Sequence, residues 1–452
     1  MRNILTTAIL LFVSWGVSRA QTPAQAPPPA SALPPLPPPP PASGPKLTLA
    51  DAVAMAIKNH PQVATARNVA LETGQHVVEA RASYYPAIAG EVTGTQGLFG
   101  SRLGAGTLSA SRLFDRAGQG MQLTQLVTDF GRRGSLLENS RLLAQAADQT
   151  TQATIYDVVF AVNKAYFGVL EAQSYVQVAE QTVTARQTLS DQVVALANAN
   201  LKSQVDVEFA NVNLSQAKLM LIRAQDGLKR SYADLARALG SDNAVDYNVE
   251  QNPAAPAPPD TDAPLVAEAI QNRPELRELR LRLQAAQRFE DAERDLKHPT
   301  VNVIATAGFL PYVNNPTNNS IPWGYEGVGV NVEIPVFNGH LFSARAQAAH
   351  YESLAQDQRL RNQQQMIERD VREAWIAAST AYQSIPVTIQ YLRQAQLALE
   401  LANGRYSLGL SSIVELTQAQ LNLTQAQIEN VTAKYDYQSA YAGLQYTIGA
   451  LR

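Results

Sequence analysis

The stretch Gly409-Leu-Ser-Ser412-Ile-Val-Glu415 has a similar counterpart earlier in the chain, and the pair indicates how the protein folds. The earlier copy reads Asn200-Leu-Lys-Ser203-Gln-Val-Asp206. In each copy a residue that tolerates the left-handed conformation, Asn200 or Gly409, comes shortly before a serine and an acid at capping-box spacing. Each copy is therefore predicted to form a helix, a sharp tip and a second, antiparallel helix.

The similarity continues without a gap from both tips into the helix that follows, and further matches lie upstream. Asn213-Leu-Ser-Gln-Ala217 matches Asn422-Leu-Thr-Gln-Ala426, and far upstream Pro86 matches Pro299. A repeat of this length predicts two copies of one structural unit. We place the copies at residues 47–241 and 265–452, with a Pro-Ala linker over 242–264.

Long helices are predicted before both tips. No proline occurs between Pro86 and Pro253, and only Pro386 follows Pro335. Apolar residues recur every three or four positions, as in packed helices. Helices over about 133–198 and 341–403 would each be roughly 100 Å long at ~1.5 Å per residue. The second would be interrupted only if Pro386 kinks it.

Each copy also contains two extended segments, near 87–95 and 119–127 in the first and near 300–309 and 327–335 in the second. In the last, Val328, Val330, Val332 and Ile334 alternate with polar or glycine positions, which is typical of strands in a membrane barrel. A soluble β-hairpin is the alternative. Four strands cannot close a barrel, and open edges are not tolerated in lipid. Membrane-spanning strands would therefore have to be shared between chains, and a trimer would supply twelve.

The N-terminal segments are predicted to direct export. Residues 1–20 combine Arg2, a short apolar core and small residues before a cleavage site, as in a signal peptide. Residues 21–46 form a Pro-rich spacer expected to be disordered. The chain has no cysteine, which excludes disulfides, thiolate metal sites and an acylated N-terminal cysteine.

Composition and motifs argue against nucleic-acid binding and catalysis. The formal net charge of the 452 residues is −3, which does not suit a nucleic-acid binder. The five histidines are scattered without metal-ligand spacing, so no cofactor, metal or enzymatic activity is expected. The Gly-rich stretch 97–106 lacks a Walker lysine and is interpreted as a mobile outer loop between the first two strands.

Four short motifs flank these elements. They are Ala80-Arg-Ala-Ser-Tyr-Tyr-Pro86, Val127-Thr-Asp-Phe-Gly-Arg-Arg133, Ile334-Pro-Val-Phe-Asn-Gly339 and Arg405-Tyr-Ser-Leu-Gly-Leu410. Together with the duplication, they make the chain from Leu47 to Leu451 similar to the TolC family of outer-membrane efflux proteins. The fold class implied is α+β, with long antiparallel helical hairpins forming a periplasmic tunnel. Four transmembrane strands per chain would contribute to a shared twelve-stranded barrel.

The resemblance implies a homotrimer in the outer membrane of a Gram-negative-type bacterium, in contact with outer-membrane lipid. It would be the passive exit duct of a tripartite efflux or type I secretion system. Its partners would be a periplasmic adaptor protein and an inner-membrane transporter. The family's tips bind the adaptor, which maps here to Asn200, Leu201, Leu408, Gly409 and Leu410.

The resemblance also implies a gated periplasmic entrance with acidic rings and hydrogen bonds between helices. The matching positions are Asp206, Tyr406, Ser411, Glu415 and Gln418. Two of them depart from the family pattern. A basic residue that helps to lock the closed state in the best-known members is Ser411 here, and a second acidic ring position is Gln418.

Two alternatives remain open at this stage. Asp206 and Glu415 are explained equally well as helix caps or, in a trimer, as carboxylates that favour cations at a pore entrance. The chain as a whole could also be a non-channel periplasmic coiled-coil adaptor or structural protein. An adaptor would be expected to carry one hairpin and a lipoyl-like β domain, and neither feature is recognised in the sequence.

Overall fold

The computed structural model describes residues 44–96, 102–105, 108–112, 116–241, 245–251, 253–313 and 323–451. The expected signal peptide and residues 21–43 of the expected spacer lie outside the described residues. One compact unit, Ala42–Arg452, holds both repeats.

The two repeats have the same order of elements: two short helices, two main strands, a very long helix and a final helix. The first copy contains α1 (Leu49–Asn59), α2 (Pro61–Ala82), β2 (Ala87–Thr95), β5 (Arg116–Thr128), α3 (Arg132–Asn198) and α4 (Gln204–Leu239). The second contains α5 (Ala263–Asn272), α6 (Pro274–Arg294), β7 (Thr300–Val313), β8 (Gly324–Glu333), α7 (Leu341–Ser407) and α8 (Ile413–Thr447). A 3-10 turn, Asp295–Lys297, follows α6.

Two short strands tie the start of the first copy to the segment between the copies. Strand β1 (Lys46–Leu47) pairs in parallel with β6 (Asn248–Val249). Leu47 and Val249 are buried there, and the Tyr166 hydroxyl on α3 donates hydrogen bonds to the carbonyls of Leu47 and Glu250. The segment around Asn248 is therefore anchored to α3 rather than free.

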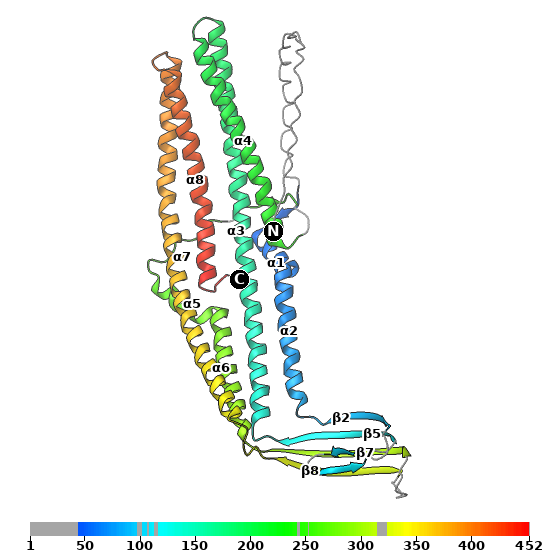
Figure 1. Ribbon diagram of the computed structural model, residues 1–452. Coiled ribbons are helices and arrows are strands. Elements are labelled where there is room, and N and C mark those ends of the chain that lie inside the picture. The colour runs from blue at the N-terminus through cyan, green and yellow to red at the C-terminus, as the bar shows by residue number, and fades with distance from the viewer. Residues whose placement is uncertain are drawn as a thin grey trace, which may run out of the picture. The chain divides into compact units, whose positions relative to one another are not determined.

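The helices form two hairpins whose tips lie at the end opposite to the sheet (Figure 1). Helix α3 packs against α4, and α7 packs against α8. Contacts of α3 with α6 and α8 join the two copies. Helices α3 and α7 each have 67 residues, or roughly 100 Å at ~1.5 Å per residue. Pro386 lies inside α7, which continues through it despite the missing N–H.

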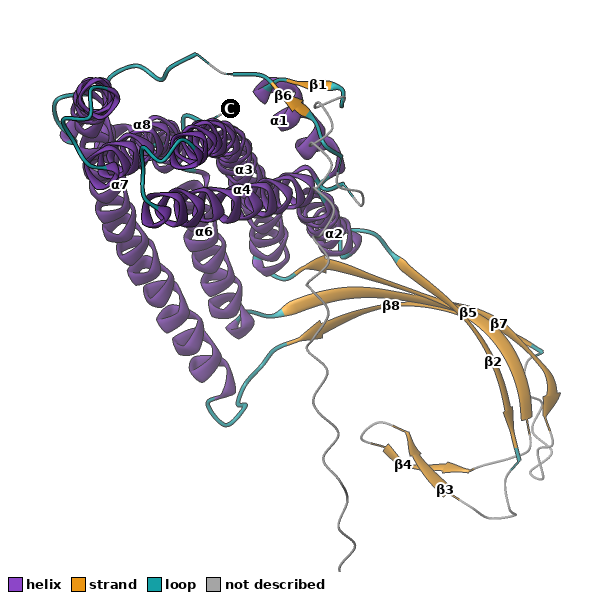
Figure 2. Ribbon diagram, turned by 90° about the horizontal axis from the view of Figure 1, so that it is seen from above, coloured by secondary structure: helices purple, strands orange, loops and turns teal. Residues whose placement is uncertain are grey.

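The main sheet is antiparallel with strand order β2-β5-β7-β8, so β2 and β8 are its edges. The sheet has four strands, and Figure 2 shows that it is curved. The fold class predicted from sequence is therefore confirmed. The prediction that 97–106 is only a loop is wrong for residues 102–105. They form β3 (Arg102–Ala105), which pairs with β4 (Leu108–Arg112), and the glycines of this stretch hid the strand signal.

The pairing register assigns every strand residue to one of two faces, because residues directly opposite each other point the same way. One face carries mostly apolar side chains: Ile88, Val92, Met121, Leu123, Val301, Val303, Val328, Val330 and Val332. The other carries mostly glycine and polar residues: Glu91, Thr93, Gly120, Gln122, Asn302, Thr306, Gly308, Tyr325, Asn331 and Glu333. Ile304 is an exception on the polar face.

Side chains on the apolar face of the sheet are exposed on both described edge strands. Val92 is 87% exposed and Val328 is 80% exposed. An apolar surface of this kind marks a contact with lipid or with another protein.

The junction between β5 and α3 is built by the motif Val127 to Arg133. The Asp129 carboxylate accepts a hydrogen bond from the Arg133 backbone N–H at 2.7 Å, which satisfies a free donor in the first turn of α3. The Arg133 guanidinium donates to the carbonyls of Ser83, Leu126 and Val127 and lies 4.1 Å from the Tyr84 ring centre. This motif therefore fixes the helices on the sheet.

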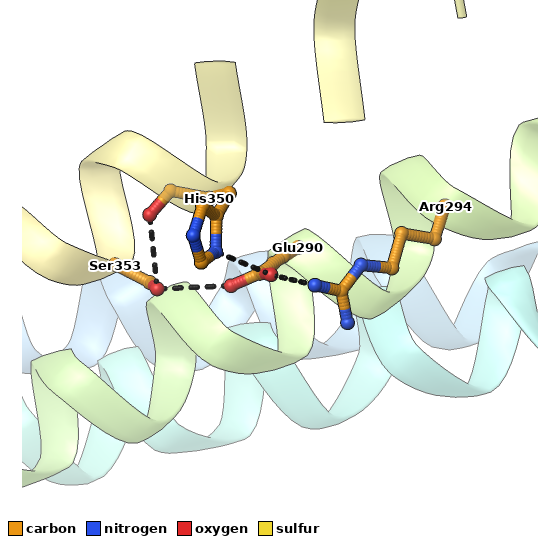
Figure 3. Close-up of polar contacts among 4 residues, drawn as sticks. All are labelled: Glu290, Arg294, His350 and Ser353. Carbon is orange, nitrogen blue, oxygen red and sulfur yellow. Dashed lines mark hydrogen bonds and ion pairs between the residues drawn. The ribbon is translucent and has the colours of Figure 1, made fainter. Parts of the chain in front are cut away.

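A polar network around the buried Glu290 joins α6 to α7 near the sheet (Figure 3). Glu290, which is 6% exposed, accepts hydrogen bonds from Ser353 at 2.9 Å and His350 at 3.0 Å and pairs with Arg294. Burial acts to raise the pKa of Glu290, but the hydrogen bonds from Ser353 and His350 and the charge of Arg294 outweigh it and lower the pKa. The network therefore holds Glu290 in its ionised form.

Candidate functional site at the hairpin tips

Both tips end in the same backbone arrangement. Asn200 and Gly409 have positive φ values of 62° and 73°. The Leu201 N–H bonds to the Leu196 carbonyl at 2.9 Å, and the Leu410 N–H bonds to the Arg405 carbonyl at 2.8 Å. These are the hydrogen bonds of a Schellman motif, which ends a helix at a left-handed residue.

The helices that follow the tips are capped differently. Ser203 accepts from the Asp206 N–H and Asp206 accepts from the Ser203 N–H at 3.1 Å, so α4 begins with a complete capping box. Ser412 accepts from the Glu415 N–H, but the Glu415 carboxylate instead accepts from Arg405 at 3.1 Å. The capping box predicted for α8 is therefore wrong in one of its two hydrogen bonds: the Glu415 carboxylate accepts from the Arg405 guanidinium and not from the Ser412 N–H.

Tyr406 lies between the two hairpins near their tips. The Lys202 ammonium is 4.4 Å from the centre of its ring. Burial and the nearby charge of Asp206 raise the pKa of the Tyr406 phenol. Within the described part of the chain, the buried hydroxyls of Tyr406, Ser411 and Thr417 have no hydrogen-bond partner. Such groups are normally satisfied by water or by a partner molecule.

Between the tips and the sheet, a seam of polar contacts joins α3 of the first hairpin to α8 of the second. Thr182 contacts Thr424 at 3.4 Å, and Thr432 donates to Glu171 at 3.2 Å. Arg186, which is only 4% exposed, donates to the amide oxygen of Gln420. No ion pair is found for Arg186 among the residues described, and burial lowers its pKa.

The tips of both hairpins line one groove of about 1390 Å³. Its walls include Leu201 and Lys202 from the first tip and Tyr406, Leu408 and Gly409 from the second. The structure thus brings together three of the five predicted adaptor-docking residues, whereas Asn200 and Leu410 do not line the groove. Lys202 is the one charged residue among those lining it.

The predicted entrance acids are engaged within the chain. Asp206 belongs to the cap of α4, and Glu415 pairs with Arg405. Gln418 is exposed and donates to Asn422 at 3.0 Å. Sequence reasoning missed Arg405, Lys202 and the Arg186–Gln420 pair. Arg405 and Lys202 lie within the quoted motifs, but nothing in the sequence indicates that Arg186 is buried.

Two features are absent from the described residues. No group of three or more His, Asp or Glu residues there is placed to hold a metal ion. None of the helices in that part of the chain is long and apolar enough to cross a membrane.

Comparison with known proteins places this geometry in context. The family model described as outer membrane efflux protein matches residues 52–241 and 265–450. The outer membrane protein TolC of Salmonella enteritidis is 25% identical over 350 residues, which cover 73% of this chain and 68% of that protein. Protein CyaE of Bordetella pertussis is 27% identical over 403 residues, which cover 85% and 80%.

Two solved structures have a similar fold. The outer-membrane channel OprN aligns with a TM-score of 0.76 at 17% identity, covering 89% of this chain and 90% of its own. CusC, described as forming a transmembrane channel, aligns with a TM-score of 0.77 at 19% identity, covering 89% and 92%.

Proposed function

This chain belongs to the outer membrane efflux protein family, and we propose that three copies close into a ring that forms the exit duct of a tripartite pump. Membership makes the protein an outer-membrane channel for efflux or secretion, within a family of transport channels rather than enzymes. The proposal adds the number of chains, the way they close and the docking of a periplasmic partner.

One observation carries the proposal: the sheet is open at both edges and apolar on one face. Among the described residues, no strand pairs with the outer edge of β2 or of β8. An open edge in lipid would leave backbone N–H and C=O groups without partners, at a cost of several kcal/mol each. Pairing β8 of one chain with β2 of the next removes both edges, and three chains give twelve strands.

The helices support the same closure. Near the sheet, contacts run from α2 to α3 to α6 to α7, and near the tips from α4 to α3 to α8 to α7. The outer helices are therefore α2 and α4 on one side and α7 on the other, matching the edges β2 and β8. Exposed apolar residues occur on these outer helices, including Leu71 and Ile222 on one side and Ile376, Leu397 and Leu401 on the other.

The groove at the tips suits a helical partner. It is lined largely by leucine, alanine and glycine, and small residues permit the close approach of another helix. We assign the docking of a periplasmic adaptor hairpin to this groove. Lys202 would favour an acidic side chain on that partner.

Two measurements test the proposal. Protein extracted with detergent from outer-membrane fractions should have the native mass of a trimer, and it should form conducting pores in planar lipid bilayers. A water-soluble monomer or dimer absent from the outer membrane would overturn the proposal in favour of a periplasmic coiled-coil protein. A trimer that does not conduct would support the proposed assembly but contradict the proposed role as a duct.

A further inference from the structure

A row of four residues crosses the polar face of the sheet. The register places Glu91 opposite Gly120, Gly120 opposite Gly308 and Gly308 opposite Tyr325. The row therefore runs from edge strand β2 to edge strand β8. It begins with a carboxylate and ends with a phenol.

The Tyr325 side chain lies across the two glycines between them. Its hydroxyl oxygen is 2.3 Å from where a Cβ on Gly120 would stand and 2.5 Å from the equivalent point on Gly308. Any larger residue at either position would displace the ring. The glycines thus form a trough that keeps Tyr325 on the polar face and directs its hydroxyl toward the side of Glu91.

Glu91, Thr93, Gly118, Gly120, Leu310 and Tyr325 line one cavity of about 330 Å³. Among side chains described on the four main strands, the charged ones are Glu91, Glu326 and Glu333, and all are acidic. Glu91 and Glu333 lie on the polar face, and Glu326 lies on the apolar face. The structure gives Glu91 no ion pair within the described part of the chain.

Glu91 therefore differs from the acids at the tips. Asp206 is used in a helix cap and Glu415 is paired with Arg405, so much of their charge is compensated locally. A carboxylate without a counter-charge acts more strongly on passing ions, as in the acidic rings of cation channels.

We infer that Glu91 forms a selectivity ring inside the barrel, with the carboxylates favouring cationic cargo and Tyr325, packed over the glycine trough, bordering the same cavity. The inference rests on the proposed trimer, which would repeat the row three times around the wall. It places charge selection in the barrel rather than only at the periplasmic tips.

The test uses the purified full-length trimer in planar bilayers under a KCl gradient. Wild-type channels should show a reversal potential whose sign indicates a preference for cations. Glu91→Gln should shift that potential toward zero. Glu326→Gln is the matched control, because this carboxylate lies one residue from Tyr325 but on the apolar face, and it should leave the potential unchanged.

A second pair of variants keeps the inference testable if Glu91→Gln assembles poorly. The chain has no cysteine, so Glu91→Cys introduces a single thiol. A positively charged methanethiosulfonate reagent should react with it in open channels and move selectivity toward anions. Val92→Cys, on the opposite face, should not respond.

The outcomes separate the two proposals. The selectivity ring would be overturned if Glu91→Gln channels conduct with the selectivity of the wild type. It would also be overturned if the reagent does not change the selectivity of Glu91→Cys channels. Absence of trimers or of conductance in the wild-type protein would instead reject the duct itself.

Discussion

At the scale of single residues, the buried cation in the seam between the hairpins gives the sharpest prediction. Arg186 on α3 is held by the neutral Gln420 on α8. Gln420→Leu would leave a buried guanidinium without that partner, and we expect it to destabilise the trimer by roughly 1–3 kcal/mol. Arg186→Met removes the charge together with the need for a partner, so its effect should be smaller.

The interaction between Arg186 and Gln420 is best measured with a double-mutant cycle, in which the melting temperatures of the wild type, both single variants and the double variant are compared in detergent. Hydrogen exchange on α3 and α8 would give a local readout. The double variant should resemble Arg186→Met alone, since Gln420 matters only while the charge is buried. If Gln420→Leu melts like wild type, Arg186 has another partner in the trimer.

At the scale of elements, the two tip helices should respond differently to loss of their acids. Asp206 completes a capping box, whereas Glu415 pairs with Arg405 and leaves the cap of α8 to Ser412. Asp206→Ala should therefore destabilise the first turn of α4 by about 1 kcal/mol, with a smaller effect of Glu415→Ala on α8. Ser203→Ala and Ser412→Ala should be similar to each other, because both serines cap.

Hydrogen exchange of the first-turn amides of α4 and α8 measures this directly. Equal loss of protection in Asp206→Ala and Glu415→Ala would contradict the asymmetry. It would mean that Glu415 leaves Arg405 in solution and completes the second box.

The α6–α7 network should make the protein sensitive to acid. The pKa of Glu290 is lowered in the folded chain, so its ionised form contributes stability above the ordinary carboxyl pKa of about 4.3. That contribution is lost as the pH falls through the lowered folded value. Melting temperature measured from pH 7 downward should therefore drop steeply in acid.

Glu290→Gln should be less stable than wild type at pH 7 and lose part of the acid dependence, because the amide does not titrate. Asp291→Asn is the control on the same helix. Asp291 is half-exposed and pairs with Arg288 at 3.6 Å, a surface contact worth little. Identical acid profiles for wild type and Glu290→Gln would assign the loss to other carboxylates.

At the scale of the whole molecule, the sequence indicated the duplication, the two hairpins and the four strands, because each has a periodic or repeated signal. Strand β8 was predictable because valine alternates with glycine or a polar residue at Val328, Val330 and Val332. Strand β3 was not, since glycines dilute its pattern. Contacts between side chains on different helices could not be predicted, because no local sequence pattern marks them. Examples are Arg405 with Glu415 and Arg186 with Gln420.

Closure of the ring through the sheet can be tested with two neighbouring residues on β8. Val330 lies on the apolar face and Asn331 on the polar face. In a closed barrel, Val330→Lys would place a charge against lipid at a cost of about 2–4 kcal/mol near the bilayer midplane. Asn331→Lys would face the water-filled lumen. We therefore expect Val330→Lys to reduce the amount of trimer recovered from outer-membrane fractions, and Asn331→Lys to assemble normally but shift ion selectivity toward anions. Because the two residues are adjacent, they lie at nearly the same depth, and the main difference between the variants is the face of the sheet. Equal recovery of both trimers would mean that the apolar face of the sheet does not meet lipid.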